Sequence, residues 1–270
     1  MSRTLLFFNA LLRFMLNEIL VLVFVLAAGI IGSMIGVGGG FIIVPMLVLI
    51  LDFSMHEAVS TSLASICGIS LSSFLIYARN GRVNYKLGVS LELFTFSGAI
   101  IGSLIASRLS CRFLEVLFAL TLIYVSFMMY RKTEENVDTE VFRGGFPRLS
   151  FAYLSSFLAG FIASMIGIGG GVLKVPVMNL ILNVPIKIAI GTSEFMIFIT
   201  SLSSTISYHL QGVGNLYHKI FGMVGGFIGG QVGSRIGLKT KSHSLRRIFV
   251  AVLLCFSVLM MIKGLTGISL

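Results

Sequence analysis

The sequence predicts an all-α integral membrane protein made of two inverted repeats, each with about 4–5 helical segments and a short or broken helix after a glycine-rich motif. Composition points first to the membrane: 56% of the 270 residues are hydrophobic and 11% are charged, against about 25% charged residues in soluble domains. The uncharged runs Ile19 to Ile35 and Ala58 to Ala78 approach or reach the roughly 20 apolar residues that a membrane-spanning helix needs. We therefore expect a multi-pass protein of the cytoplasmic membrane.

Two stretches of the chain repeat each other. Ser33 to Leu51 and Ser164 to Leu182 are identical at 12 of 19 aligned positions, at a sequence offset of 131. The same offset, without a gap, aligns Thr61 and Tyr77 with residues of the same type in the second half. Apolar composition raises the number of chance matches but does not align Gly, Pro, Thr and Tyr, so we interpret the chain as a duplication. The predicted divisions are a first membrane repeat at 1–130, a polar linker at 131–149 and a second membrane repeat at 150–270.

Each half is expected to contain the same series of helical segments. An apolar helix comes first, at about 19–35 and 150–166, and a short apolar piece follows, at 41–51 and 172–182. At 1.5 Å per residue, these short pieces of about 11 residues cross only about half of the hydrocarbon core. Three full-length helices complete each half, which gives about 8–10 segments in all, counting the short ones.

The basic residues predict the orientation in the membrane. Thirteen of the 20 Lys and Arg residues lie in the loops 79–86, 131–148, 183–187 and 235–247. By the positive-inside rule, the side that holds these loops is cytoplasmic. The loop 79–86 then lies inside while its repeat counterpart 209–217 lies outside, so the two halves are inverted. The net charge of +10 is thereby explained by orientation, and no nucleic-acid partner is expected.

The repeated motifs GVGGGFIIVP, from Gly36 to Pro45, and GIGGGVLKVP, from Gly167 to Pro176, are the focal segments. Such glycines can interrupt a helix, and the helix that begins after them offers unpaired N–H groups and a partial positive charge to an anion. Two breaks at corresponding positions of two halves are typical of a transporter binding site. The alternative is that the glycines only allow helices to pack closely. The candidate glycines are Gly38, Gly39, Gly40, Gly169, Gly170 and Gly171.

Polar residues near these motifs extend the candidate site. The hydroxyls of Thr61 and Ser62, and of their counterparts Thr192 and Ser193, can donate to an oxyanion, or they can bond to their own or a neighbouring helix. The remaining candidates are ionisable residues whose repeat counterparts are apolar, namely Lys174 and Glu194 opposite Ile43 and Leu63.

An ionisable group within the membrane is costly, and by default it is a hypothesis of function. Lys174 could attract an anion and Glu194 could carry a coupling proton. The alternative is a salt bridge between the two that only orders the helices.

Two pairs of aromatic residues lie near predicted helix ends. Tyr77 and Tyr208 are candidates for a gate or for anchors at the membrane interface. His209 and His218 are expected in a solvated external loop. The three cysteines are far apart in the sequence, so neither a disulfide framework nor a metal site is indicated, and no cofactor is expected.

The doubled GxGGGxxxVP motif, the Thr-Ser pair that follows it and the Tyr-x-x-x-Gly loop resemble the TauE/SafE family of membrane transporters, also called the toluene-sulfonate-uptake permease family. The likeness runs from about residue 18 to residue 264. It implies export or uptake of sulfur oxyanions and organosulfonates, such as sulfite or sulfoacetate. It also implies a site formed by the candidate glycines with Thr61, Ser62, Thr192 and Ser193. Glu194 departs from the small apolar residue that the family pattern leads us to expect after Thr-Ser.

The expected function is secondary transport of a small anion by alternating access, with the anion bound between the halves and the protein surrounded by membrane lipid. A passive anion channel is the alternative within transport, and a membrane scaffold or assembly protein is the alternative from another class. The sequence has no HExxH, no GxSxG and no paired membrane carboxylates, so no enzyme is expected. The coupling ion, proton or sodium, and a homo-oligomeric state are left open.

Overall fold

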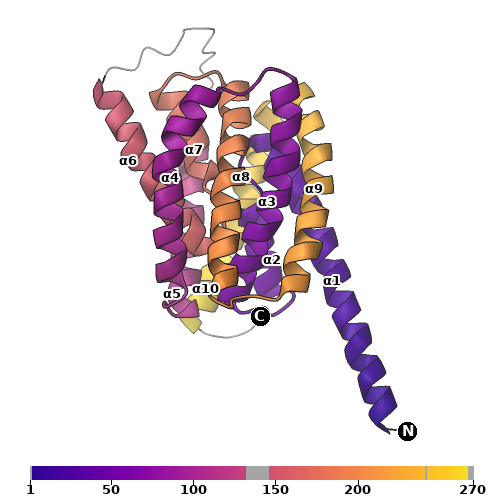
Figure 1. The fold of residues 1–270 in the computed structure, drawn as a ribbon. Helices are drawn as coiled ribbons and strands as arrows, with labels where there is room; N and C mark the ends of the chain where they lie inside the picture. Colours follow the sequence, from indigo (N-terminus) through magenta and orange to yellow (C-terminus); the bar gives the residue numbers. More distant parts are fainter. Residues whose placement is uncertain (1, 132–145, 241, 267–270) are drawn as a thin grey trace.

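The computed structural model describes residues 2–131, 146–240 and 242–266, and within these ranges the regular structure is helical, with no strand (Figure 1). The helices are α1 (Ser2–Ile35), α2 (Gly40–Leu49), α3 (Met55–Arg79), α4 (Tyr85–Ala106), α5 (Cys111–Arg131), α6 (Phe146–Ile166), α7 (Gly171–Pro176), the π-helical turn η1 (Val177–Ile181), α8 (Ile186–Leu210), α9 (Leu216–Lys239) and α10 (Ser242–Thr266). The all-α prediction is confirmed.

The helix boundaries repeat at the offset of 131 that the sequence shows. The first residues of α2 and α7, of α3 and α8, of α4 and α9 and of α5 and α10 differ by this number, and so do the last residues of α1 and α6. The predicted short segments are confirmed as α2 and as α7 with η1. Helix α1 begins well before the predicted residue 19, and α6 begins at Phe146, four residues before the predicted start. Most of the predicted linker, residues 132–145, lies outside the described residues.

The helices form two bundles that do not coincide with the two halves of the sequence. Helix α9 packs against α1 and α3, whereas α4 packs against α6 and α8. The first bundle is therefore α1, α2, α3 and α9, and the second bundle is α4, α6, α7 and α8. Helix α3 packs against α8 across the boundary between the bundles, and α5 pairs with α10. Each half thus lends one long helix to the bundle built mainly from the other half.

Glycines explain how α9 fits so closely against α1. A Cβ atom added at Gly225, Gly229 or Gly233 would meet carbonyl oxygens of α1 at Leu22, Leu26 and Ile30. Small residues at every fourth position allow two backbones to approach, as is common in membrane helices.

The counterpart helices α3 and α8 pack antiparallel. Near the start of α3, the Ser60 hydroxyl donates to the carbonyl oxygen of Val213 in the loop after α8, at 3.0 Å. Near the start of α8, a Cβ atom at Gly191 would touch the carbonyl oxygen of Arg82 in the loop after α3. Each helix therefore begins beside the loop that follows the other one.

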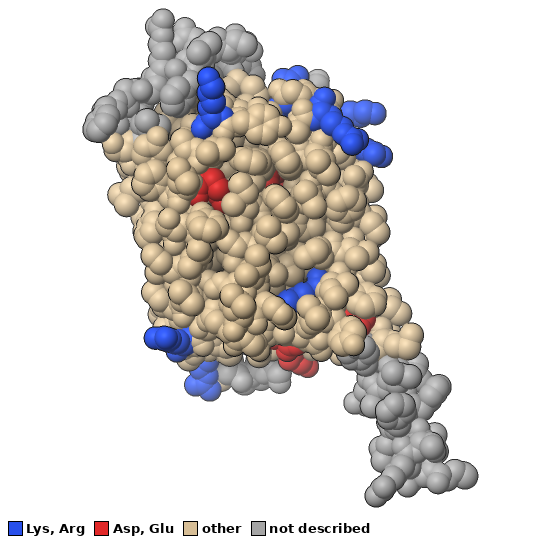
Figure 2. Space-filling view, in the orientation of Figure 1, with Lys and Arg blue, Asp and Glu red and all other residues tan. Residues whose placement is uncertain are grey.

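The surface of the molecule matches a lipid environment. Four helices in the described part of the chain are long and apolar enough to cross a membrane: Met15–Ile35, Met55–Arg79, Tyr85–Ala106 and Ile186–Leu210. Figure 2 shows Lys and Arg gathered mainly at the two ends of the molecule, with a broad and mostly uncharged band between them. Such a band, flanked by basic ends, is the surface that a hydrocarbon core requires. The protein is a multi-pass membrane protein.

Candidate functional site

The two glycine-rich breaks touch each other at the boundary between the bundles. A Cβ atom at Gly40 would overlap the carbonyl oxygen of Gly167 and lie 2.8 Å from Ile168 Cα. In the same way, a Cβ atom at Gly171 would lie 2.5 Å from the carbonyl oxygen of Gly36. The close approach explains why both positions are glycine, and it brings the predicted site residues of the two halves into one place.

The backbone of both breaks has the left-handed conformation that glycine adopts readily. The φ angles are 82° at Gly38 and 81° at Gly39, and 82° at Gly169 and 80° at Gly170. Short helices begin directly afterwards, at Gly40 and Gly171. Among the described backbone hydrogen bonds, none uses the N–H of Gly38, Gly39 or Gly40. These donors are therefore free to receive an acceptor.

The serines of the two Thr-Ser pairs hold the breaks together. Ser62 Oγ donates to the carbonyl oxygen of Gly167 at 2.7 Å, and Ser193 Oγ donates to that of Gly36 at 3.0 Å. All of these residues are buried. Because a hydroxyl has a single proton to donate, neither serine can also donate to an anion in this arrangement. Their observed role is to join each central helix to the glycine-rich loop of the opposite half.

The threonines of these pairs differ from each other. Thr192 Oγ1 accepts the backbone N–H of Asn84 at 2.9 Å, which fixes the start of α4 against α8. Thr61 is also completely buried, and its Oγ1 has no hydrogen-bond partner. An unpartnered buried hydroxyl is costly, so Thr61 remains a candidate for contact with a substrate.

Lys174 lies in a closed triangle of buried polar groups. Its Nζ contacts Glu92 Oε2 at 3.1 Å and donates to Thr200 Oγ1 at 2.9 Å, and Thr200 Oγ1 donates to Glu92 Oε1 at 2.6 Å. Lys174 is 2% exposed, Glu92 3% and Thr200 0%. The triangle adjoins the second break, because a Cβ atom at Gly170 would lie 3.4 Å from Lys174 Cε.

The alternative prediction of a salt bridge between Lys174 and Glu194 is wrong. Lys174 pairs with Glu92, which was not among the site residues predicted from the sequence, and Thr200 was also missed. The signal for Glu92 was present, since it is a carboxylate within the span Tyr85–Ala106, and intramembrane ionisable groups are rare. What the sequence could not show is that α4 crosses to the second bundle.

Glu194 is buried in α8 next to the Thr-Ser pair. The residue has no exposed surface, and neither carboxylate oxygen has a hydrogen-bond partner. An ionised carboxylate without a donor is very unfavourable in such surroundings, so this side chain needs a proton or a cation. The predicted coupling role of Glu194 stays a prediction.

Tyr77 and Tyr208 are buried and make equivalent contacts. The hydroxyl of Tyr77 donates to the carbonyl oxygen of Ser33 at 3.4 Å, and that of Tyr208 donates to Ser164 at 3.1 Å. With exposures of 1% and 0%, they do not reach the membrane surface, so the alternative of interface anchors is wrong. Their role as gates stays a prediction.

A second ionisable cluster lies at the far end of the first bundle. His218 Nδ1 contacts Glu57 Oε1 at 3.1 Å, and Nε2 lies 3.3 Å from Glu18 Oε1. The ring of Phe53 stacks on the imidazole at 4.6 Å. His218 is 7% exposed, so the expectation of a solvated loop is wrong for His218, although His209 is exposed. The burial follows from α9 beginning at Leu216 and packing against α1 and α3.

Comparison with known proteins places the chain in a family. The model of the family "Sulfite exporter TauE/SafE" matches residues 21–260. The chain is 31% identical over 219 residues to "Probable membrane transporter protein YunE" of Bacillus subtilis, covering 73% of this chain and 80% of the relative. It is 30% identical over 190 residues to a probable membrane transporter protein of Methanocaldococcus jannaschii, covering 67% of this chain and 68% of the relative.

A shorter match comes from a plant. The Arabidopsis thaliana protein "Sulfite exporter TauE/SafE family protein 6" is 37% identical over 70 residues, which is 26% of this chain and 16% of the relative. No solved structure gives a significant match. Because the family model covers most of the chain, including both glycine-rich breaks, the chain belongs to the TauE/SafE sulfite exporter family and is a membrane transporter of that type.

Proposed function

We propose that the protein is a secondary transporter that moves a sulfur oxyanion or organosulfonate, with sulfite as the first candidate, across the membrane by alternating access. The family description supports the substrate class. The observation that carries the proposal is the contact between the two glycine-rich breaks, with the buried cation Lys174 beside one of them.

The chemistry of the site suits a small oxyanion. The free backbone N–H groups lie at the start of α2, which is the positive end of its helix dipole. Both features favour the binding of an anion. Lys174 supplies a full positive charge beside the second break. An anion held by these N–H groups and the ammonium group exchanges its hydration shell for protein donors.

We further propose that the two halves have opposite orientations across the membrane. The antiparallel packing of α3 and α8 supports this, as do the exchanged contacts Ser62 to Gly167 and Ser193 to Gly36. In an inverted pair, the site at the contact can open to either side when one bundle tilts against the other. The moving bodies would be the two bundles, because α4 and α9 pack in the bundle opposite to their own half.

Counterflow in proteoliposomes tests the function. Liposomes that contain the protein and unlabelled sulfite are diluted into labelled sulfite, and a carrier then accumulates label transiently above the external concentration. A passive channel gives only equilibration, and a scaffold protein gives no flux. We expect a transient overshoot that K174M abolishes, and transport by K174M at the wild-type rate would remove Lys174 from the site.

Orientation has its own test. Reporters placed in the loop 80–84 and in the loop 211–215 should be found on opposite sides of the membrane. Detection of both on the same side would exclude the inverted arrangement.

A further inference from the structure

Lys174 lies in the triangle with Glu92 and Thr200, and its charge is already balanced by Glu92 in the observed state. The triangle therefore does more than provide a lysine that binds an anion. Its ammonium group contacts Glu92 Oε2 at 3.1 Å and Thr200 Oγ1 at 2.9 Å. An anion cannot gain the full attraction of Lys174 while Glu92 holds it. Lys174 can therefore bind an anion only if its ion pair with Glu92 is broken.

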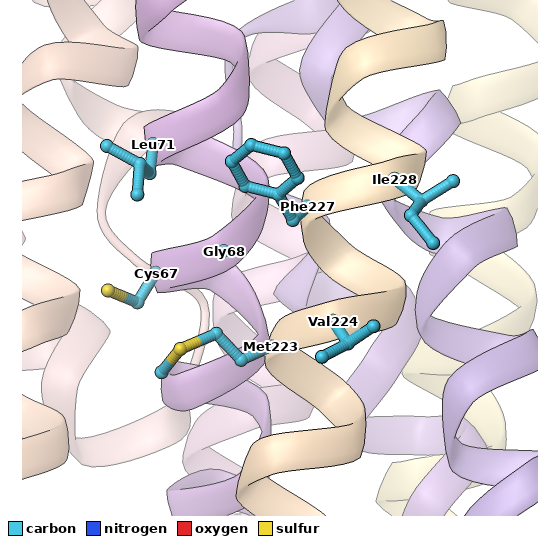
Figure 3. A pocket seen from close by; sticks show the side chains of 7 residues that line it. All are labelled: Cys67, Gly68, Leu71, Met223, Val224, Phe227 and Ile228. Atoms are coloured by element: carbon cyan, nitrogen blue, oxygen red, sulfur yellow. The ribbon is translucent and has the colours of Figure 1, made fainter.

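The ion pair has no counterpart at the corresponding positions of the first bundle. The repeat counterparts of Lys174, Thr200 and Glu92 are Ile43, Ile69 and Met223. Ile43 and Ile69 are completely buried, and Met223 lines an open apolar groove between α3 and α9 together with Cys67, Gly68, Leu71, Val224, Phe227 and Ile228 (Figure 3). The first bundle thus has no charge at these three positions, although Met223 is 37% exposed where Glu92 is buried. A buried ion pair is also weak support for stability, since desolvation offsets most of the attraction.

Few other charged groups face Glu92. Helix α7 brings Lys174 and α8 brings Thr200, and both contact the carboxylate. Helix α6 brings Tyr153, whose ring stacks on Phe94 two residues further along α4. Glu194 on α8 makes no ion pair or hydrogen bond in the described part of the chain. Among the described residues, Lys174 is therefore the cation that balances Glu92, and neither group has a second ion-pair partner.

We propose that Glu92 is an internal counter-ion that the transported anion displaces from Lys174, and that one proton taken up by Glu92 accompanies each singly charged anion. This inference rests on the proposed transport function. The proton converts the carboxylate of Glu92 to the neutral acid, Lys174 remains an ammonium group, and the anion takes the place of the carboxylate. Release of the anion and of the proton on the other side restores the ion pair.

Both states of this cycle leave the site without net charge. In the empty state the ammonium of Lys174 is balanced by Glu92, and in the loaded state it is balanced by the anion. A net charge inside the membrane is costly. Because the site is neutral in both states, the protein can switch the site from facing one side of the membrane to facing the other without that cost. Thr200 is placed to serve both states, since its hydroxyl accepts from Lys174 and donates to a carboxylate oxygen that an anion oxygen would replace.

The test uses the full-length protein in proteoliposomes with labelled sulfite and a clamped membrane potential. A pH difference of about one unit, acid outside, raises the steady-state accumulation about tenfold for each coupled proton. The proton that is part of bisulfite enters with the anion in every variant. A difference in pH-driven accumulation between the wild type and E92Q therefore reports on the proton carried by Glu92. In E92Q the amide keeps the shape of the side chain but takes up no proton.

We expect E92Q to continue counterflow at a changed rate and to lose about tenfold in pH-driven accumulation. The matched control is E115Q, which replaces a buried glutamate of α5, 6% exposed, and should keep both activities. Unchanged accumulation in E92Q would overturn the coupling proposal, and so would loss of counterflow in a folded E92Q protein. Absence of sulfite counterflow in the wild type would instead overturn the transport function, and the coupling with it.

The accumulation of bisulfite by the wild type is a second test, and it does not depend on how the variants fold. If Glu92 carries a proton, internal bisulfite should rise about tenfold above external bisulfite at a pH difference of about one unit. If bisulfite only equalises across the membrane, the coupling proposal is excluded.

Discussion

The interface of α3 with α9 and the interface of α8 with α4 are repeat counterparts, yet they differ in chemistry. The first is apolar throughout its groove, which is lined by Cys67, Met223 and their neighbours (Figure 3). The second encloses the triangle of Glu92, Lys174 and Thr200. The difference teaches that the duplication supplies the helices twice, whereas, among the described residues, the ion pair at these positions occurs in the second bundle.

Other contacts are the same in both halves, in contrast to the triangle. Both glycine-rich breaks, both serines and both buried tyrosines make equivalent contacts. We interpret these symmetric contacts as the ones that hold the bundles together, and the asymmetric ones as the ones that perform the chemistry. The following predictions test this division, beginning with the largest expected effect.

Removing the charge of Lys174 alone should be the most damaging change. K174M leaves Glu92 as an uncompensated buried carboxylate, and breaking a buried pair in this way costs about 3–5 kcal/mol. The triple variant E92M/K174I/T200I copies the counterparts from the first bundle, and its stability should equal or exceed that of the wild type. Thermal unfolding in detergent measures both variants. If the triple variant is as unstable as K174M, the triangle is structural and the comparison fails.

Filling the contact between the breaks should destabilise the protein equally from either side. G40A and G171A each place a methyl group against the opposite loop, and overpacking of this kind costs about 1–3 kcal/mol. The control is G81N, because Gly81 has open space around it with φ at 65°, and Asn tolerates that conformation. Denaturation midpoints that differ widely between G40A and G171A would contradict the proposed symmetry.

Loss of the serine hydroxyls should have a symmetric effect that is no larger than that of the glycine variants. S62A and S193A each leave a buried glycine carbonyl without its donor, at a cost of about 1–3 kcal/mol. Because these hydroxyls bond to the loops, we expect a lower stability with little change in the KM for sulfite. A large rise in KM without loss of stability would make the serines candidates for substrate ligands again.

The smallest effect is expected in the cluster at the end of the first bundle. The side chain of Glu57 is 31% exposed, and partly solvated ion pairs contribute about 0–1 kcal/mol. E57Q should therefore leave stability and counterflow nearly unchanged, in contrast to E92Q. A strong loss of transport in E57Q would show that the first bundle also carries chemistry.

Much of the fold was readable from the sequence because its signals are local. The offset of 131 predicted the positions of the short helices, and the starts of α3 and α8 at Met55 and Ile186 follow it. The glycines of the breaks were also identified, since a run of glycines interrupts a helix through its own backbone freedom. The prediction of site residues was less complete. Ser62 and Ser193 were predicted either to donate to a substrate or to bond to their own or a neighbouring helix. Their observed partners are glycine carbonyls more than 100 positions away in the chain.

The sequence by itself determined the membrane environment, the duplication and the two helix breaks, because hydropathy and backbone freedom are properties of neighbouring residues. Only the tertiary structure decided that α4 and α9 exchange bundles, and hence that Lys174 pairs with Glu92 and not with Glu194. The physical reason is that pairing of buried charges depends on which helix faces lie in contact. That choice is made by the packing of small residues between helices that are distant in the chain.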